Sequence, residues 1–348
     1  MIKWLELTAS DKKTAYEQIG IRTGRSPFIV EKDWWVVQTL SIIFDLPVGK
    51  NLVFNGGTSL SKAWQIIGRF SEDVDLAIDR EYLGFTGDLN KHQRTKLRKL
   101  AGMFVTGPFL KDLKEAFELR GFKDVRVEVE KAHCSDQDPR IINIHYPNLI
   151  TAPGYLAPRV QVEVGCRSLR EPYSIQVFNS LVDEYYPDKT LIQPPIQVPS
   201  VAPERTFLEK LFLLHEAFQH PEENMRVNRR SRHLYDISKV AKTHHGKNAL
   251  CDPTLYEMIV NHRFRFTRIG GIDYNLHQPQ TLSPLPPVSL MKEWSEDYRA
   301  MLEQMIYERN APSFETIISD VTELKMIINA VPWKMKTVFP AREQEEQV

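Results

Sequence analysis

The spacing of apolar residues predicts a region of mixed helices and strands followed by a helical region. Apolar side chains recur every three or four residues over 8–20 and 27–44, which indicates two helices, and Ser26-Pro27 is a start signal for the second. Alternation of apolar and polar residues indicates short strands. These strands cover residues 51–54, 73–78, 125–129, 141–145, 160–164 and 174–178. Further helices are predicted over residues 60–67, 91–120, 204–219, 231–243, 288–309 and 313–330.

Two proline-rich stretches, 193–203 and 278–287, interrupt this pattern. Proline lacks an amide hydrogen and ends helices and central strands, so both stretches are predicted to be linkers. The fold class expected is therefore α+β. Three parts follow: N-terminal helices over 1–50 that pack on the core, a core over 51–192, and a helical C-terminal domain over 200–348.

Composition indicates an ordinary globular chain, with 26% charged and 42% apolar residues and a formal net charge of zero. That balance excludes a chain-wide basic coat for nucleic acid and leaves room for a local basic patch. No apolar run approaches the length of a membrane span, and the N-terminus lacks the apolar core of a signal peptide. Three widely separated cysteines fit neither a disulfide framework nor a zinc site. We expect a cytoplasmic protein without a membrane partner.

The turn Gly56-Gly57-Thr58 lies between a predicted strand and a predicted helix. Glycine allows backbone angles that other residues avoid and lets a ligand approach the main chain. The amide groups at the start of the following helix suit a phosphate. The hydroxyls of Thr58 and Ser59 and the ammonium group of Lys62 could add contacts. A strand-to-helix turn also needs glycine for conformational reasons alone, so the turn by itself is weak evidence for a nucleotide site.

Asp73 and Asp75 give the turn its chemical context. They alternate with Val74, Leu76 and Ile78, so the two carboxylates project from one face of a strand whose other face is apolar. Two carboxylates so close repel each other unless a cation lies between them. Mg²⁺ takes one or two carboxylates together with phosphate oxygens and water. We expect two Mg²⁺ ions here, with Mn²⁺ as a substitute, in a site for metal-assisted nucleotidyl transfer. The alternative is an edge strand with a solvated acidic face.

This chemistry needs a third carboxylate on a neighbouring strand. Glu163 is the first candidate, because it faces away from the apolar side of the predicted strand 160–164. Glu128 and Glu130 alternate in the same way over 125–130 and form a rival pair. A solvated strand face explains any of the three glutamates nearly as well.

GGTSLSKAW (56–64) and RFSEDVDLAI (69–78) closely resemble the first two motifs of the AbiEii-type toxin nucleotidyltransferases. These are proteins of bacterial type IV toxin–antitoxin and abortive-infection systems, related to the MenT toxins, within the polymerase-β-like nucleotidyltransferase superfamily. FIVEKDWWVVQTL (28–40) resembles the family's N-terminal helix. PERTFLEKLFLLHE (203–216) resembles its third motif, and SRHLYDISKV (231–240) its fourth.

The resemblance implies two further site residues. Lys210 is the lysine of the third motif and would contact the triphosphate, and Asp236 is the aspartate of the fourth and would orient Lys210 or assist the acceptor hydroxyl. Helical spacing places Lys210 at the border of an apolar stripe, and Glu216 is expected on the solvent side of the same helix. The chain departs from the family at Arg232-His233, where many members carry Lys-Asp, so no role is carried over to His233. Asp236 is also explained by an ion pair with Arg232 one turn away.

The resemblance implies a polymerase-β-like core, a mixed sheet with flanking helices, that transfers a nucleoside monophosphate from a nucleoside triphosphate. The acceptor it suggests is RNA, in some members the 3′ end of tRNA, and a cognate antitoxin protein is the implied partner. Two alternatives stay open: transfer to a protein or small molecule, and a non-catalytic module that binds nucleotide or antitoxin.

Two basic clusters could hold an RNA backbone. The first contains Arg94 and Arg98, and the second contains Arg226, Arg229 and Arg230. A third segment, 262–271, interleaves basic and aromatic residues. Each cluster is explained equally by a solvated helix face or loop.

Overall fold

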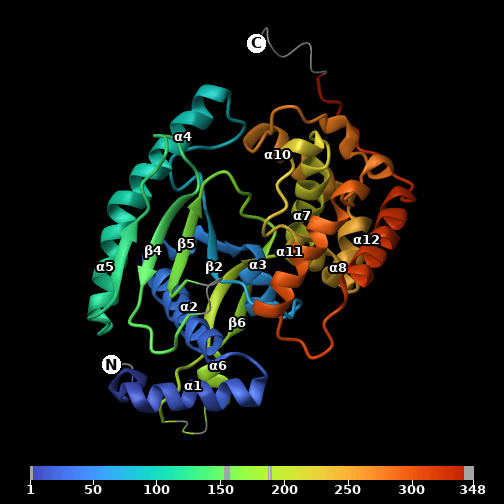
Figure 1. Ribbon diagram of the computed structural model, residues 1–348. Helices are drawn as coiled ribbons and strands as arrows, with labels where there is room; N and C mark the ends of the chain where they lie inside the picture. Colours follow the sequence, from blue (N-terminus) through green and yellow to red (C-terminus); the bar gives the residue numbers. More distant parts are fainter. Residues whose placement is uncertain (1–2, 153–156, 187, 189, 341–348) are drawn as a thin grey trace. The chain divides into compact units, whose positions relative to one another are not determined.

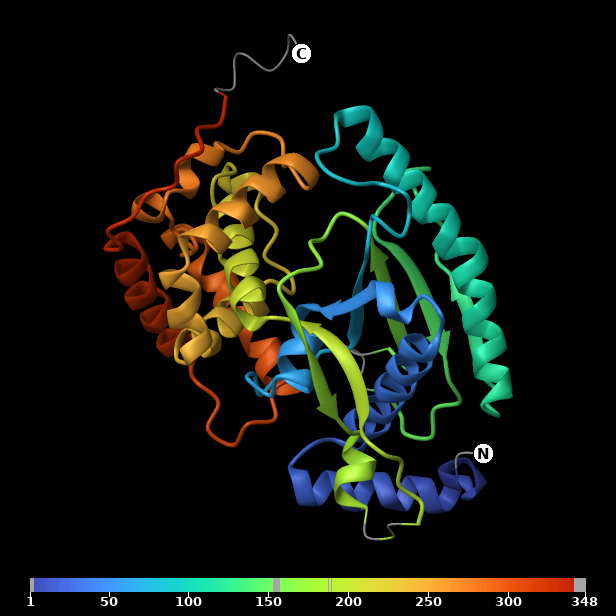
Figure 2. The same ribbon diagram turned by 180° about the vertical axis from the view of Figure 1, so that it is seen from behind.

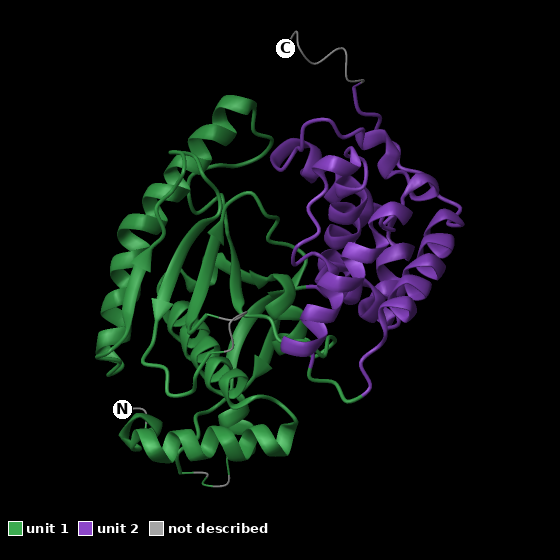
Figure 3. Ribbon diagram, viewed as in Figure 1, with its two compact units in different colours: residues 1–201, 307–309 green, residues 202–306, 310–348 purple. Residues whose placement is uncertain are grey.

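The computed structural model describes residues 3–152, 157–186, 188 and 190–340 of the 348-residue chain. The chain divides into two compact units, shown in different colours in Figure 3. Unit 1 comprises residues 1–201 and 307–309, and unit 2 comprises residues 202–306 and 310–348.

Unit 1 is organised around a mixed seven-stranded sheet with the order β3-β4-β5-β2-β1-β7-β6 (Figure 1). The neighbours β2 and β5 run parallel, as do β1 and β7, and the other neighbouring pairs are antiparallel. The strands are β1 (Leu52–Asn55), β2 (Asp73–Ile78), β3 (Arg126–Val129), β4 (Arg140–His145), β5 (Arg159–Gly165), β6 (Tyr173–Phe178) and β7 (Ile196–Val201). The expected α+β class with a mixed sheet and flanking helices is therefore confirmed.

Helices cover this sheet. The long helix α2 (Pro27–Asp45) is capped by Ser26, whose hydroxyl accepts a hydrogen bond from the amide of Ile29, and the helix packs against β5 and β7. Helix α1 (Ala9–Thr23) and the short α6 (Leu181–Tyr185) contact α2, and a 3-10 turn, Lys3–Glu6, precedes α1 (Figures 1 and 2). Helix α5 (Leu110–Leu119) contacts the edge strand β3. The predicted helix 91–120 is confirmed as α4 (Lys91–Phe104), a π-helical segment (Val105–Phe109) and α5 (Leu110–Leu119).

Residues 196–201, predicted to be part of a linker, form the strand β7. That prediction was wrong because Pro199 was taken to exclude a strand between two others. β7 pairs with all six residues of β6, and its ladder with β1 contains the single pair Phe54–Ser200. A short ladder on one side tolerates a residue that lacks an amide donor.

The helix after the glycine turn is shorter than predicted. It consists of α3 (Gly56–Thr58) and a π-helical segment (Ser59–Ala63), and it ends before Ile67. Gln65 has a φ of 54°, in the left-handed region that an L-residue enters only at the end of a helix or in a turn. The backbone therefore turns away toward β2 one turn earlier than the apolar spacing indicates.

Unit 2 is helical. Its helices are α7 (Pro203–Ala217), α8 (Ser231–Ala241), α9 (His244–Cys251), α10 (Pro253–Phe266), α11 (Met291–Gln304) and α12 (Phe314–Asn329), with 3-10 turns at Glu222–Asn224, Tyr274–His277, Pro279–Thr281 and Val288–Leu290. The sequence pattern did not predict α9 and α10. The predicted helix 288–309 is too long, since α11 ends at Gln304 and residues 307–309 belong to unit 1.

The segment 307–309 contacts other residues of unit 1. The amide of Tyr307 donates to the carbonyl oxygen of Gly68, and the guanidinium group of Arg25 stacks over the Tyr307 ring.

Cys134, Cys166 and Cys251 are all free thiols, and Cys166 is buried. In the part of the chain that the structure describes, no helix combines the length and the apolar character needed to cross a lipid bilayer.

Candidate active site

Gly56 and Asp75 are in direct contact at the start of the turn. Gly56 has a φ of 77°, and a Cβ atom added to it would lie 2.0 Å from Oδ2 of Asp75. Both the backbone angle and the available space therefore require glycine at this position. The missing side chain lets the Asp75 carboxylate lie directly against the turn that was predicted to hold phosphate.

The acidic face of β2 follows the predicted alternation. Val74 and Leu76 are buried on one face, and Asp73 and Asp75 are half-buried on the other. The hydroxyl of Thr58 donates a hydrogen bond to the main-chain oxygen of Asp73 over 2.5 Å, which ties the turn to the strand. The hydrogen of the Thr58 hydroxyl is therefore already donated to the main chain of β2.

Ser59, the other hydroxyl predicted to contact phosphate, is 1% exposed. Its Oγ has no hydrogen-bond partner among the described residues. A buried hydroxyl without a partner costs free energy.

Glu163 lies beside Asp75 on the neighbouring strand. In the parallel ladder between β2 and β5, Asp75 is opposite Glu163 and Asp73 is opposite Gln161. The side-chain amide of Gln161 donates to Oε1 of Glu163 over 2.8 Å, which orients the carboxylate. Because partners across a ladder share a face of the sheet, all four polar side chains project from the same side.

The rival glutamates lie elsewhere. Glu128 is on the edge strand β3, with β4 and β5 between it and β2, and it is paired with Arg126 at 2.8 Å. Glu130 follows the end of β3. Two intervening strands place Glu128 at about 14 Å from β2, given a strand spacing of roughly 4.8 Å. Glu163 is thus the glutamate that the register brings next to Asp75.

A row of buried charges on α2 flanks these carboxylates. Lys32 is 1% exposed, and its Nζ lies 2.5 Å from Oε2 of Glu72, the residue before Asp73, and donates to the carbonyl oxygen of Ala157. Burial lowers the pKa of Lys32, and the Glu72 carboxylate opposes that shift. No role for Lys32 or Glu72 was predicted from the sequence. Their signal was the presence of charged residues inside otherwise apolar runs.

Lys62, predicted to contact the triphosphate, forms an ion pair with Asp33 of α2. Its Nζ lies 2.7 Å from Oδ1 of Asp33, and both side chains are largely buried. Oδ2 of Asp33 accepts from the amide of Leu181 over 2.6 Å. To reach a phosphate, Lys62 would have to leave or share this carboxylate.

Arg69 is a second buried cation for which the sequence predicted no role. It is 1% exposed, and a Cβ atom added to Gly57 would lie 2.5 Å from its Nη2. Gly57 therefore leaves room for a guanidinium group, as Gly56 does for a carboxylate. The two glycines of the turn accommodate side chains of opposite charge.

The donor set of β2 and β5 fits a hard cation. Among the residues that the structure describes, no three His, Cys, Asp or Glu side chains already form a metal cage. Mg²⁺ does not require one, since it usually keeps several waters and takes one or two carboxylates plus substrate phosphates. Asp73, Asp75 and Glu163 offer carboxylate oxygens of that kind from adjacent positions on one sheet face.

In unit 2, Lys210 and Asp236 form a buried ion pair. Nζ of Lys210 on α7 lies 3.0 Å from Oδ2 of Asp236 on α8, and the Asp236 side chain is fully buried. Nδ1 of His233 lies 3.5 Å from the same ammonium group. The two residues implied by the third and fourth motifs are therefore neighbours, with His233 beside them.

Glu216 corrects the expectation for the same helix. It is completely buried rather than solvated, because Arg263 on α10 and His277 both donate hydrogen bonds to its carboxylate. Burial alone would raise the pKa of Glu216, and these hydrogen bonds outweigh it and hold the pKa below its ordinary value. Arg263, from the predicted RNA-contact segment 262–271, therefore has an internal carboxylate partner.

The predicted basic clusters differ from each other. Arg94 donates to the carbonyl oxygen of Leu89 at 2.9 Å, and Arg98 is paired with Asp136 at 2.6 Å, so a carboxylate offsets the charge of Arg98.

In the second cluster, burial lowers the pKa of Arg230, and the neighbouring charges of Arg226 and Arg232 lower it further. The backbone there is held by Asp297, which accepts hydrogen bonds from the amides of Arg229 and Ser231. The second cluster therefore brings the positive charges of Arg226, Arg230 and Arg232 close together.

Comparison with known protein families gives one match, to the model described as Nucleotidyl transferase AbiEii toxin, Type IV TA system, over residues 39–320. The chain belongs to the AbiEii family. This match covers the glycine turn, both aspartates, Glu163, Lys210 and Asp236. Membership identifies the chain as a nucleotidyltransferase of the toxin–antitoxin type, with a nucleotide substrate and an antitoxin partner.

Solved structures give matches of low identity. MenT4, a nucleotidyltransferase toxin from Mycobacterium tuberculosis H37Rv, is 17% identical, and the match covers 92% of this chain and 99% of that chain with a TM-score of 0.44. JHP933 from Helicobacter pylori is 13% identical, with 86% and 91% covered and a TM-score of 0.39. A search of curated protein sequences finds no match.

Proposed function

We propose that this AbiEii protein uses Mg²⁺ to transfer a nucleoside monophosphate from a nucleoside triphosphate to a hydroxyl group of RNA, with the 3′ end of tRNA as the acceptor. The observation that carries the proposal is the contact of Gly56 with Asp75, and the position of Glu163 opposite Asp75 in the parallel ladder. The glycine turn that follows β1 and the carboxylate cluster of β2 and β5 then lie side by side in the middle of the sheet.

In this reaction the acceptor hydroxyl oxygen forms a bond to the α-phosphorus. The bond from the α-phosphorus to the bridging oxygen breaks, pyrophosphate leaves with that electron pair, and the hydroxyl proton passes to solvent or a nearby base. Mg²⁺, when bound, lowers the pKa of the attacking hydroxyl and balances the charge of the leaving pyrophosphate.

The residues of β2, β5 and the glycine turn have separate roles in the proposal. Asp73, Asp75 and Glu163 hold the cation, and Gln161 keeps the Glu163 carboxylate oriented through its 2.8 Å hydrogen bond. Gly56 and Gly57 leave room for the Asp75 carboxylate and the Arg69 guanidinium group to lie against the turn, beside which the triphosphate would bind.

The lysines and arginines bind anions in the proposal. Lys210 contacts the triphosphate, and Asp236 keeps its ammonium group in place at 3.0 Å. Arg226 and Arg230 are the better-supported RNA contacts, because their like charges are gathered and a phosphate backbone would relieve the repulsion. Arg98 is less favoured, since Asp136 already offsets its charge.

The test is transfer of labelled nucleotide by the purified chain. Each of the four α-³²P-labelled nucleoside triphosphates is incubated with the protein, Mg²⁺ and total tRNA, and the products are separated before and after digestion with ribonuclease. The proposal predicts label that enters tRNA, disappears on digestion, and requires a divalent cation that EDTA removes. Label that survives ribonuclease on a protein or small molecule would contradict the RNA acceptor, and no transfer with any nucleotide would contradict the proposal as a whole.

A further inference from the structure

One face of the sheet in unit 1 is largely polar across the four neighbouring strands β3, β4, β5 and β2. Residues opposite each other in successive ladders share a face, so the register arranges their side chains in rows. The first row, where β3 and β5 begin and β4 ends, contains Arg126, His145 and Arg159. The next row contains Glu128, Asn143, Gln161 and Asp73, and the one after it contains Ile141, Glu163 and Asp75. A basic row therefore lies next to the carboxylates proposed to hold the cation.

The side chains of the basic row reach solvent. Those of Arg126 and His145 are 68% and 33% exposed, and Arg159 is half-buried. The other face of the same strands is closed, since Val160 and Val162 are fully buried and helix α2 contacts β5. A large ligand can therefore approach these strands on the polar face.

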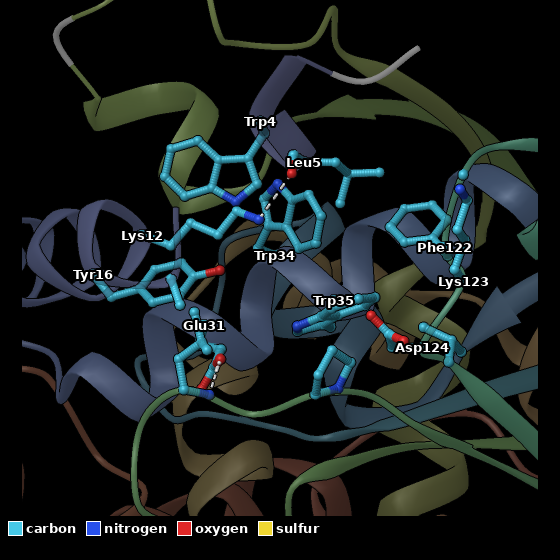
Figure 4. A pocket seen from close by; sticks show the side chains of 15 residues that line it. Trp4, Leu5, Lys12, Tyr16, Glu31, Trp34, Trp35, Phe122, Lys123 and Asp124 are labelled. Atoms are coloured by element: carbon cyan, nitrogen blue, oxygen red, sulfur yellow. Dashed lines mark hydrogen bonds between the residues drawn. The ribbon is translucent and has the colours of Figure 1, made fainter. Parts of the chain in front are cut away.

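The cavity on the far side of α2 offers no comparable surface. It measures about 240 Å³ and lies between α1, α2 and the segment 121–125, where the rings of Trp34, Trp35 and Phe122 help to line it (Figure 4). This volume is below the range typical of sites for drug-sized ligands, so a strand of RNA does not fit there.

Arg159 differs from other partly exposed arginines of unit 1. Its Nη2 donates a hydrogen bond to Oε1 of Gln161 at 3.2 Å, which is a neutral amide oxygen. By contrast, an aspartate forms an ion pair with each of Arg98, Arg167 and Arg170. A guanidinium group has five N–H donors in a planar fork that matches a phosphate, so Arg159 can bind one while it keeps its contact with Gln161.

The positive charge of the basic row is strongest at the end nearest β2. At the other end, a carboxylate oxygen of Glu128 lies 2.8 Å from Nε of Arg126 and offsets its charge. The second oxygen of Glu128 lies 3.6 Å from Nε2 of His145. The row is therefore most attractive to an anion at Arg159, on the strand that is adjacent to β2.

The strand order places Arg159 and the glycine turn on opposite sides of β2. The turn follows β1, Arg159 begins β5, and β2 lies between these two strands. In phosphoryl transfer, the attacking and leaving oxygens lie roughly in line on opposite sides of the phosphorus. With the triphosphate beside the turn, the acceptor hydroxyl approaches from the side of β5.

We propose that the 3′-terminal strand of the acceptor RNA lies over the polar face of β5 and β4, and that one of its backbone phosphates binds the guanidinium group of Arg159. This inference rests on the proposed function, because it locates the acceptor of that reaction. The contact with a phosphate gives position and orientation and carries no preference for a base.

Binding of RNA without transfer tests the contact. A short single-stranded RNA with a 5′ fluorescein label and a free 3′ hydroxyl is titrated with the full chain in Mg²⁺ and without nucleoside triphosphate, and fluorescence anisotropy gives Kd at several salt concentrations. Arg159→Gln should raise Kd about tenfold, the effect of losing one charge-assisted hydrogen bond. It should also reduce the slope of log Kd against log salt by about 0.7, the contribution of one phosphate of a single strand.

Arg22→Gln is the matched control. Arg22 is an exposed arginine of α1, and its Nη1 donates to the neutral main-chain oxygen of Tyr185 at 3.3 Å. Its replacement should change neither Kd nor the slope. Arg159→Gln with the Kd and slope of the unchanged chain would overturn the contact.

Arg159→Lys separates the charge from a purely structural role. Lysine keeps the positive charge and loses the planar fork, so this variant should retain the salt slope of the unchanged chain. A slope reduced equally in the Lys and Gln variants would show that the shape of the Arg159 side chain, rather than its charge, supports binding, and would overturn the phosphate contact.

Photocrosslinking locates the RNA without any substitution. The same RNA carries 4-thiouridine as its 3′-terminal nucleotide, the complex is irradiated, and the crosslinked peptides are identified by mass spectrometry. We expect crosslinks in peptides that contain β4 or β5. Crosslinks confined to other parts of the chain, or no binding of RNA at all, would overturn the placement, even if Arg159→Gln does not fold.

These readouts are independent of nucleotidyl transfer. Crosslinks to β4 or β5 without any transfer would contradict the proposed function and leave the RNA surface in place. Transfer of label to RNA together with normal RNA binding by Arg159→Gln would contradict this inference and leave the proposed function in place.

Discussion

Gly56 leaves the space that the Asp75 carboxylate fills, since a Cβ atom added to Gly56 would lie 2.0 Å from Oδ2 of Asp75. Gly56→Ala should therefore displace the carboxylate and lower the transfer rate by about 100-fold or more, the scale seen when one charge-stabilising group is removed. The left-handed backbone adds a strain of about 1–2 kcal/mol to the free energy of folding. Both effects are measured, by transfer of labelled nucleotide and by urea unfolding.

Gly84 provides the matched control. It has a φ of 83°, and an added Cβ atom would meet no heavy atom within 4 Å. Gly84→Ala should cost the same strain and retain full transfer activity. Equal activity losses in the two variants would show that strain, rather than displacement of Asp75, explains the effect of Gly56→Ala.

Glu163→Gln should lower the transfer rate by about 100-fold or more and weaken activation by Mg²⁺, because the amide keeps the shape of the side chain and loses its charge. Glu128→Gln is the control, since it changes the same residue type on the edge strand β3. Rates are measured across a range of Mg²⁺ concentrations. A larger loss in Glu128→Gln than in Glu163→Gln would reverse the choice of the third carboxylate.

The pair of Lys210 and Asp236 should affect stability and activity separately. Asp236→Ala leaves a largely buried ammonium group without its partner at 3.0 Å and should destabilise the protein by about 3 kcal/mol. The double variant Lys210→Met with Asp236→Leu replaces the ion pair with apolar groups and should regain most of that stability in urea unfolding. Transfer activity should be lost in both variants, and an active double variant would make the pair purely structural.

His215 should make stability depend on pH. Burial, followed by the neighbouring His277, lowers its pKa from 6.5 to about 4. The unfolded chain therefore binds a proton first as the pH falls, so stability is complete above pH 6.5 and decreases toward pH 4, by about 3 kcal/mol from this group. His215→Gln removes that contribution, which is measured as the difference from the unchanged protein in urea unfolding at pH 7 and pH 4.

The exposed His244 is the control for this prediction. His244→Gln should leave the pH dependence as it is in the unchanged protein. A pH dependence that persists in His215→Gln would assign the loss of stability to other groups.

The sequence predicted most of unit 1 because its signals are local. Alternation along β2 placed Asp73 and Asp75 on one face, and the burial of Val74 and Leu76 confirms that pattern. β7 was missed because Pro199 is a local signal against a strand, whereas its partners β1 and β6 are distant in sequence. Local patterns identify an element, and they do not identify which strands will pair with it.

The buried charges could not be predicted for the same reason. Glu216 looks solvated in its own helix, and it is buried because Arg263, 47 residues later, donates to it. The position of Glu163 depends on the register between β2 and β5, which the alternation within either strand leaves open. Lys62 was predicted as a phosphate contact, and its pairing with Asp33 depends on the packing of α2 against the core.

The most direct measurement compares Asp75→Asn with Asp79→Asn in the transfer assay. Asp79 is the residue directly after β2. Its Oδ2 atom lies 3.2 Å from Nη1 of Arg170, with which it forms an ion pair. The account predicts that Asp75→Asn abolishes incorporation of labelled nucleotide at every Mg²⁺ concentration, while Asp79→Asn retains it. Full activity of Asp75→Asn, in a protein that unfolds at the same urea concentration as the unchanged chain, would contradict the assignment of the active site.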